Sequence, residues 1–334
     1  MIESNNASPS VRRKERRSAS RRFAPALSAL LLAAALLSGC GANDDNAEGK
    51  VNVVTTIYPL YYIAQQIGGE QASVVNLVAA GVEPHDWTPK SRDLTRASKA
   101  QLFIYNGAGL EGWLDDFLPA IASGGDVRTV EASRGIALID GHGEEEDEHE
   151  HGDAGESHHH GDVDPHTWVS PRSALTMAAN IKDAFVAADS SHRADYEARY
   201  EKLNERLLAL DAKFAETLAP YAGRDIVVSH QAFGYLCRDY GLNQLAIMGL
   251  SPDAEPRAKD LLNISDYVKE HGITTIFFEE LVSSRLADTL AKEANVGTMV
   301  LNPLEGLTPD QEKAGEDYFS LMEANLQNLQ KALG

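Results

Sequence analysis

The stretch from Ser191 to Leu218 reads SHRADYEARYEKLNERLLALDAKFAETL, and its apolar residues recur every three or four positions. They are Tyr196, Tyr200, Leu203, Leu207, Leu210 and Phe214. This period is that of one face of an α-helix. At a rise of about 1.5 Å per residue, the helix is roughly 40 Å long, which suits a strut between two lobes better than a helix lying on one sheet. We therefore predict a linking helix over residues 191–219.

Strand-like and helix-like segments alternate on both sides of this helix. Before it, strands are expected at 51–57, 73–79 and 101–106, with weaker candidates at 127–130 and 136–139. After it, strands are expected at 225–229, 243–248, 273–278 and 298–301, and a closing helix at 311–333. Such alternation favours mostly parallel sheets flanked by helices. The predicted fold class is α/β, with an N-terminal lobe at 51–190 and a C-terminal lobe at 220–334.

The first 39 residues have the order of a secretory signal, with a basic segment, an apolar run from Phe23 to Leu37 and then small residues. The run is shorter than the ~20 residues that a membrane-spanning helix needs. It closes on Leu37-Ser38-Gly39-Cys40, which resembles a bacterial lipobox. We expect cleavage after residue 39, lipidation of Cys40 and a polar tether over 40–50. A retained signal anchor is the alternative.

The composition restricts the classes of partner. The formal net charge of −20 disfavours nucleic-acid binding and favours cations. Only Cys237 remains after Cys40, so a mature monomer has no internal disulfide. Cys237 lies in an apolar helical run and is expected to be a small buried residue rather than a ligand.

An acidic loop at 141–163 contains no Lys or Arg between Gly141 and Asp164. Six histidines stand in it, namely His142, His149, His151, His158, His159 and His160. The loop has no helical or strand period, and its composition cannot bury a core. Because neutral imidazoles and carboxylates bind divalent metals, we predict a loose metal-gathering loop. The alternative is a solvated acidic linker whose histidines have no such role.

Four candidate metal ligands stand at the ends of strands or of the acidic loop: His85, His166, His230 and Glu279. In open parallel α/β sheets, ligands bind beyond the carboxyl ends of the strands, so these side chains are expected to meet in the cleft between the lobes. Three imidazoles and one carboxylate suit zinc, whereas manganese prefers more oxygen. A lone histidine after a strand is weak evidence, and the prediction depends on their shared position.

The chain resembles the metal-binding lipoproteins of bacterial ABC importers, the zinc (ZnuA-like or AdcA-like) branch of the cluster A-I solute-binding proteins. The matching segments are Gly81–His85 (GVEPH), Asp164–Pro171 (DPHTWVSP), Ser229–Leu236 (SHQAFGYL), Phe278–Ser284 (FEELVSS) and Leu301–Gly306 (LNPLEG). The resemblance implies that the first three segments bind metal through His85, His166 and His230. It also implies an acidic fourth ligand in the C-terminal lobe, which by position is Glu279, with Glu280 as the alternative.

The resemblance further implies an extracytoplasmic monomer that captures Zn(II) and passes it to an ABC permease with its ATPase. Such a protein is anchored through lipidated Cys40 to the outer face of the cell membrane or lies in the periplasm. Manganese members carry a carboxylate in place of His230, which favours zinc over a manganese or iron cargo. A zinc hydrolase is a further alternative, but a fourth protein ligand would close the open position that activates water. No HExxH motif supplies a general base. A metal-storing surface adhesin is the third possibility.

Overall fold

The computed structural model describes residues 49–141, 163–252 and 256–334. All of them belong to one compact unit, residues 46–334. The predicted signal segment, Cys40, most of the tether and the six histidines of the acidic loop lie outside the described residues. Among the helices that are described, none has the length and apolar character needed to cross a membrane.

The first half is a parallel four-stranded sheet of order β2-β1-β3-β4. Its strands are β1 (Val51–Thr55), β2 (Ala72–Asn76), β3 (Leu102–Tyr105) and β4 (Arg128–Glu131). Its helices are α2 (Tyr58–Gly68), α3 (Ser91–Ser98), α4 (Leu114–Gly124) and α5 (Pro171–Ala188). Successive strand residues face opposite sides, so Val53 packs in the layer of α2 and α5 while Val54 packs in that of α3 and α4.

The second half repeats this arrangement with the order β6-β5-β7-β8, again all parallel. Its strands are β5 (Asp225–Val228), β6 (Asn243–Ala246), β7 (Thr275–Phe278) and β8 (Gly297–Val300). Its helices are α7 (Gly234–Tyr240), α8 (Ala258–Glu270), α9 (Arg285–Ala294), α10 (Pro309–Ala314) and α11 (Tyr318–Leu333). Val227 and Ile276 pack in the layer of α8 and α9, and Phe277 faces the opposite side. The two sheets confirm the predicted α/β class.

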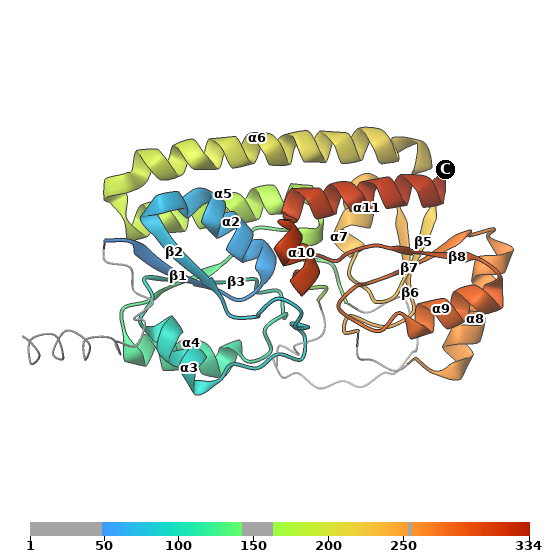
Figure 1. Cartoon of the computed structure of the whole chain (residues 1–334), viewed down its shortest axis with the longest axis horizontal. Coiled ribbons are helices and arrows are strands. Elements are labelled where there is room, and N and C mark those ends of the chain that lie inside the picture. Colours follow the sequence, from blue (N-terminus) through green and yellow to red (C-terminus); the bar gives the residue numbers. More distant parts are fainter. Residues whose placement is uncertain (1–48, 142–162, 253–255) are drawn as a thin grey trace, which may run out of the picture. The chain divides into compact units, whose positions relative to one another are not determined.

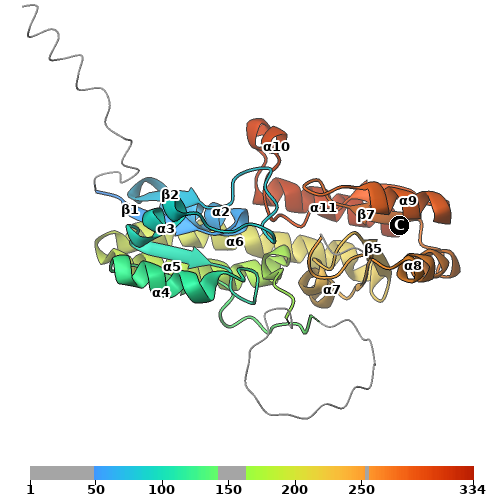
Figure 2. The same cartoon turned by 90° about the horizontal axis from the view of Figure 1, so that it is seen from below.

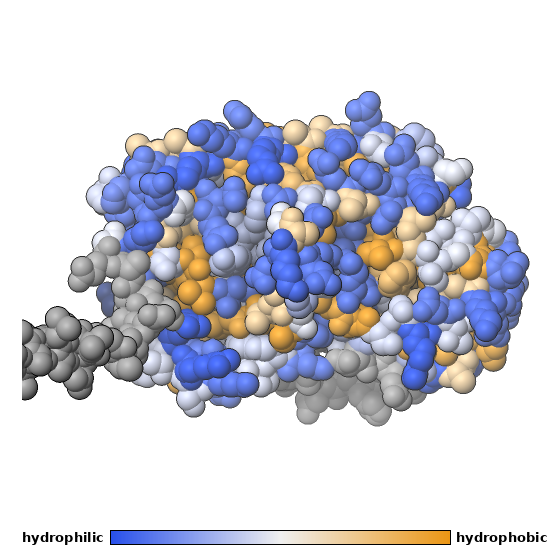
Figure 3. Space-filling view, viewed as in Figure 1, coloured by the Kyte–Doolittle hydropathy of each residue, from blue (hydrophilic) through white to orange (hydrophobic). Residues whose placement is uncertain are grey.

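Helix α6 (Arg193–Leu218) runs along both halves (Figure 1). Its buried residues are Tyr196, Leu203, Leu207, Leu210, Phe214 and Leu218. They join α2, α5 and α11 in one hydrophobic cluster that includes residues of both sheets. The views of Figure 1 and Figure 2 agree that α11 lies beside the second part of α6. Hydrophilic side chains are prominent along the outer side of α6 (Figure 3), as expected for a helix with one buried face.

Two expectations from the sequence were wrong. Residues 136–139 do not form a strand: β4 is the edge of its sheet, and the described segment that follows it contributes only an isolated bridge between Asp140 and Val163. The closing helix is two helices rather than one. Gly315 ends α10 in the left-handed conformation, and Asp317 begins α11 by accepting a hydrogen bond from the Ser320 amide.

Candidate metal centre

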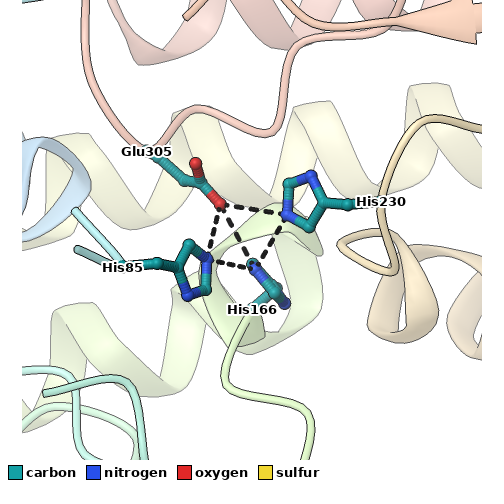
Figure 4. Close-up of side chains that lie close together, drawn as sticks. All are labelled: His85, His166, His230 and Glu305. Atoms are coloured by element: carbon teal, nitrogen blue, oxygen red, sulfur yellow. Dashed lines mark hydrogen bonds and ion pairs between the residues drawn. The ribbon is translucent and has the colours of Figure 1, made fainter. Parts of the chain in front are cut away.

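Three imidazoles and one carboxylate converge where the two halves meet (Figure 4). His85 lies in the loop between β2 and α3, and His166 directly precedes a short 3-10 turn before α5. His230 lies just beyond β5, and Glu305 lies in the loop between β8 and α10. One potential ligand atom from each residue lies within 4.8 Å of the others. The structure therefore brings together the three histidines predicted from the sequence.

The spacing of these four atoms suits one small ion. The Nε2 atom of His166 lies 3.1 Å from that of His85 and 3.2 Å from that of His230. The Oε1 atom of Glu305 lies 3.2 Å from Nε2 of His85 and of His166 and 3.3 Å from that of His230. A tetrahedral zinc with bonds of about 2.0–2.1 Å requires edges of roughly 3.3–3.4 Å between its ligand atoms. The donors thus already have nearly tetrahedral spacing.

Burial differs among the four side chains. Those of His166, His230 and Glu305 are fully buried, whereas that of His85 is 10% exposed. The centre is therefore shielded from water except on the side of His85. In such surroundings charged groups interact more strongly than at the surface.

Two further carboxylates orient the imidazoles of His166 and His230 by accepting from their Nδ1 atoms. His166 Nδ1 donates to Asp164 Oδ1 at 2.8 Å, and the backbone N–H of His166 donates to the same oxygen at 2.9 Å. His230 Nδ1 donates to Glu279 Oε1 at 2.6 Å, and Ser229 Oγ donates to that oxygen at 2.7 Å. A carboxylate on Nδ1 fixes the ring and leaves Nε2 for the centre, an arrangement typical of metal-ligating histidines.

The pKa values of the metal-free centre favour protonated imidazoles beside ionised carboxylates. Burial lowers the pKa of His230, but the charge of Glu279 and the hydrogen bonds outweigh it and raise the pKa to about 10. Burial likewise opposes the hydrogen bonds of His166 to Asp164 and Glu305, which leave its pKa raised. Burial raises the pKa of Glu305, yet the hydrogen bonds from the imidazoles hold it well below its usual value. A metal must therefore displace protons in order to bind.

The predicted fourth ligand is placed differently. Glu279 directly follows β7, which pairs with β5, so its side chain reaches His230 from the Nδ1 side and not at the corner occupied by Glu305. Glu280 is directed elsewhere, because its Oε2 accepts from Asn302 Nδ2 at 2.8 Å. The structure thus places Glu305, and not Glu279, beside the Nε2 atoms of the three imidazoles, while Glu279 contacts His230 from its Nδ1 side.

Sequence reasoning missed Glu305, although the segment Leu301–Gly306 contains it. The signal was available, since Glu305 is an acidic residue on a loop beyond the carboxyl end of a predicted strand. What brings it to the centre is a turn at Leu304, which has a φ of 59° in the left-handed region. A non-glycine residue rarely adopts that conformation, so residue type did not indicate the turn.

The remaining cysteines and histidines of the chain lie away from these four side chains or outside the described residues. Cys237 is buried and free, and burial raises the pKa of its thiol, as expected for a small apolar residue. His192 and His271 lie outside the centre: His192 Nδ1 donates to Asp189, and the ring of His271 stacks on Tyr267. The six loop histidines and Cys40 lie in the segments that the structure does not describe.

Comparison with known proteins identifies relatives over nearly the whole folded part. The profile of a family described as "Zinc-uptake complex component A periplasmic" matches residues 53–332. The chain is 42% identical over 300 residues to the zinc-binding lipoprotein AdcA of Streptococcus pneumoniae, covering 90% of this chain and 59% of AdcA. It is 40% identical over 304 residues to the high-affinity zinc uptake system protein ZnuA of Bacillus subtilis, covering 91% and 94%.

Solved structures agree with this. The Zn(II)-bound ZnuA-like domain of Streptococcus pneumoniae AdcA superimposes with a TM-score of 0.73 and 38% identity, covering 85% of this chain and 99% of that domain. The chain spans about three fifths of the length of the AdcA proteins that it matches, and nearly the full length of the Bacillus subtilis relative.

Proposed function

The chain belongs to the family of periplasmic zinc-uptake components, and from this premise we propose that it captures Zn(II) at His85, His166, His230 and Glu305 and delivers it to a membrane permease. The observation that carries the proposal is the spacing of the four donor atoms, 3.1–3.3 Å along the edges that include His166 or Glu305. Membership in a family described as periplasmic places the protein outside the cytoplasm.

The donor set favours zinc over manganese or iron. Three imidazole nitrogens and one carboxylate oxygen make a compact tetrahedral site for zinc. Manganese prefers octahedral sites that are rich in oxygen. The carboxylates of Asp164 and Glu279 contact the Nδ1 atoms of His166 and His230, on the side of each ring away from the four donor atoms.

The same geometry favours a carrier over a hydrolase. A catalytic zinc keeps one position for water, whereas four protein donors occupy all the corners of the proposed tetrahedron. The family is one of uptake components and not of enzymes. In this proposal the zinc ion is bound and released without chemical change. The partly exposed His85 marks the side on which the ion exchanges with solvent.

The proposed partners are an ABC permease and its ATPase at the cytoplasmic membrane. In this proposal Cys40 is lipidated after cleavage of residues 1–39 and tethers a monomer to the membrane, while the acidic loop at 141–163 collects zinc near the centre. The composition of the loop supports this role, since imidazoles and carboxylates are ligands for divalent cations.

Titration of the purified protein with Zn²⁺ against a chromophoric chelator tests the proposal. We expect one tight site that is severely weakened by His85→Ala, His166→Ala, His230→Ala or Glu305→Ala. His271→Ala is the matched control, because His271 Nδ1 interacts only with the backbone oxygen of Tyr267 among the described polar groups. Tight binding that survives the loss of two of the four ligands, or a preference for Mn²⁺ over Zn²⁺, contradicts the proposal.

A further inference from the structure

The two halves place similar polar groups at the same point of their sheets. Each sheet reverses its strand order at its central pair, β1 with β3 and β5 with β7, where ligand sites form in such folds. A hydroxyl residue directly follows the first strand of each pair and donates to a buried carboxylate. Thr56 Oγ1 donates to Glu111 at 2.6 Å, and Ser229 Oγ donates to Glu279 at 2.7 Å. In the second half that carboxylate holds His230 directly.

In the first half the carboxylate holds Asn106 instead, which directly follows β3 as Glu279 follows β7. Glu111 accepts from the backbone N–H of Asn106 at 2.8 Å and from that of Gly107 at 3.0 Å. These bonds fix a tight turn in which Gly107, Ala108 and Gly109 have φ values of 79°, 51° and 82°. The buried Glu111 thereby sets the direction in which the side chain of Asn106 leaves the strand.

The side chain of Asn106 bonds to both neighbours of His166, to the backbone of Pro165 and to the side chain of Thr167. Asn106 Nδ2 donates to the carbonyl oxygen of Pro165 at 2.9 Å. Asn106 Oδ1 accepts from Thr167 Oγ1 at 3.0 Å. Asn106, His166 and Thr167 are fully buried, so water does not compete for these bonds.

We propose that Asn106, held by Glu111, is a positioning residue that sets His166 for zinc capture. The inference rests on the proposed zinc centre. Asp164 fixes the rotation of the imidazole ring, and Asn106 fixes where the backbone presents it. Asn106 itself touches none of the four proposed ligand side chains through a described hydrogen bond, so it acts through His166 and not on the ion.

The test compares Asn106→Ala and Thr167→Val with a matched control, Asn180→Ala. Asn180 Nδ2 also donates to two carbonyl oxygens in the first half, those of Ala132 and Arg134, both at 2.9 Å, but away from His166. Zinc affinity is measured by chelator competition and the melting temperature of the metal-free protein by calorimetry. Removing a group that hydrogen-bonds a metal ligand directly typically weakens binding about 10–100-fold; Asn106 acts one residue further out, through Pro165 and Thr167, so we expect the lower end of that range, about tenfold, for Asn106→Ala. Thr167→Val is expected to lose several-fold, and Asn180→Ala to lower only the melting temperature.

The decisive measurement repeats Asn106→Ala and Thr167→Val in a His166→Ala background. If Asn106 acts through His166, each further loss of affinity shrinks to a small fraction of its size in the wild type, as a double-mutant cycle detects. Losses of equal size in both backgrounds, or wild-type affinity in both variants, overturn the inference. Where Asn106→Ala does not fold, the Thr167→Val pair decides in the same way. A wild-type protein that does not bind zinc refutes the proposed function itself.

Discussion

Replacing Glu279 and Glu305 separately by Gln distinguishes the two carboxylates that approach the same imidazole. Glu305 Oε1 lies 3.3 Å from Nε2 of His230, the atom directed at the centre. Glu279 Oε1 accepts from Nδ1 on the other side of the ring at 2.6 Å. Glutamine has the same shape and retains an oxygen for each contact. The two variants therefore remove charge without removing packing.

The expected losses differ in size. In the Glu279→Gln variant the amide oxygen can still accept from Ser229 and His230, so the change weakens only an outer contact, which costs about 10–100-fold in zinc affinity. This is about 1.4–2.7 kcal/mol of binding free energy. Glu305→Gln removes the single negative charge among the four proposed donors and replaces it with an amide, a poor zinc ligand, so its loss should exceed about 100-fold.

Competition with a calibrated chelator at pH 7 measures both affinities, with Glu280→Gln as the control. Glu280 adjoins Glu279 but bonds to Asn302 and Gln311, away from the centre, so the affinity of this control should stay within about twofold of the wild type. The reasoning is refuted if Glu279→Gln loses more affinity than Glu305→Gln. That result would make Glu279 the ligand and Glu305 its support.

Three other predictions concern protons, the acidic loop and a buried tryptophan. The pKa of His230 in the metal-free protein is raised to about 10. Its proton therefore stabilises the metal-free fold fully below about pH 6.5, and this stabilisation is lost as the pH rises from about 6.5 to about 10. Zinc affinity should rise over the same pH range, and calorimetry in buffers of different ionisation enthalpy should detect the protons released on binding. Deleting residues 142–160 should reduce the number of zinc ions bound but preserve one tight site, and loss of that site in a titration contradicts the proposed division of roles. In the wild type, Trp168 Nε1 donates to the Pro303 carbonyl at 2.7 Å, and Trp168→Phe removes this donor. Denaturant unfolding should therefore show a loss of about 1–3 kcal/mol in the free energy of unfolding; an unchanged midpoint argues against this contribution.

The fold class could be predicted because hydrophobic period and the alternation of strand-like with helix-like segments are local properties of the sequence. The spacing of Leu203, Leu207 and Leu210 in one helix, and the β-branched run at 51–57, are readable from the sequence alone. Histidines beyond strand ends indicated the centre for the same reason, since strand ends of parallel sheets gather at one edge.

The acidic fourth ligand of the proposed metal centre could not be assigned in this way. Glu279 and Glu305 both follow strands of the second half, and only tertiary geometry separates them. Glu279 is next to its strand and remains behind His230, whereas Glu305 is carried forward by the left-handed turn at Leu304. The break of the closing helix at Gly315 was likewise decided by capping and not by apolar period.

The hydrophobic cluster that passes through α2, α5, α6 and α11 into both sheets bears on how cargo leaves. A rigid-body opening of the two halves would expose leucine and phenylalanine side chains along α6 to water, at a cost of roughly 1.5–3 kcal/mol for each. If the chain delivers zinc to a permease as proposed, the permease is therefore expected to release the ion by displacing a loop. The segment carrying His85, the one proposed ligand whose side chain is exposed to solvent, is where the proposed permease would be expected to act.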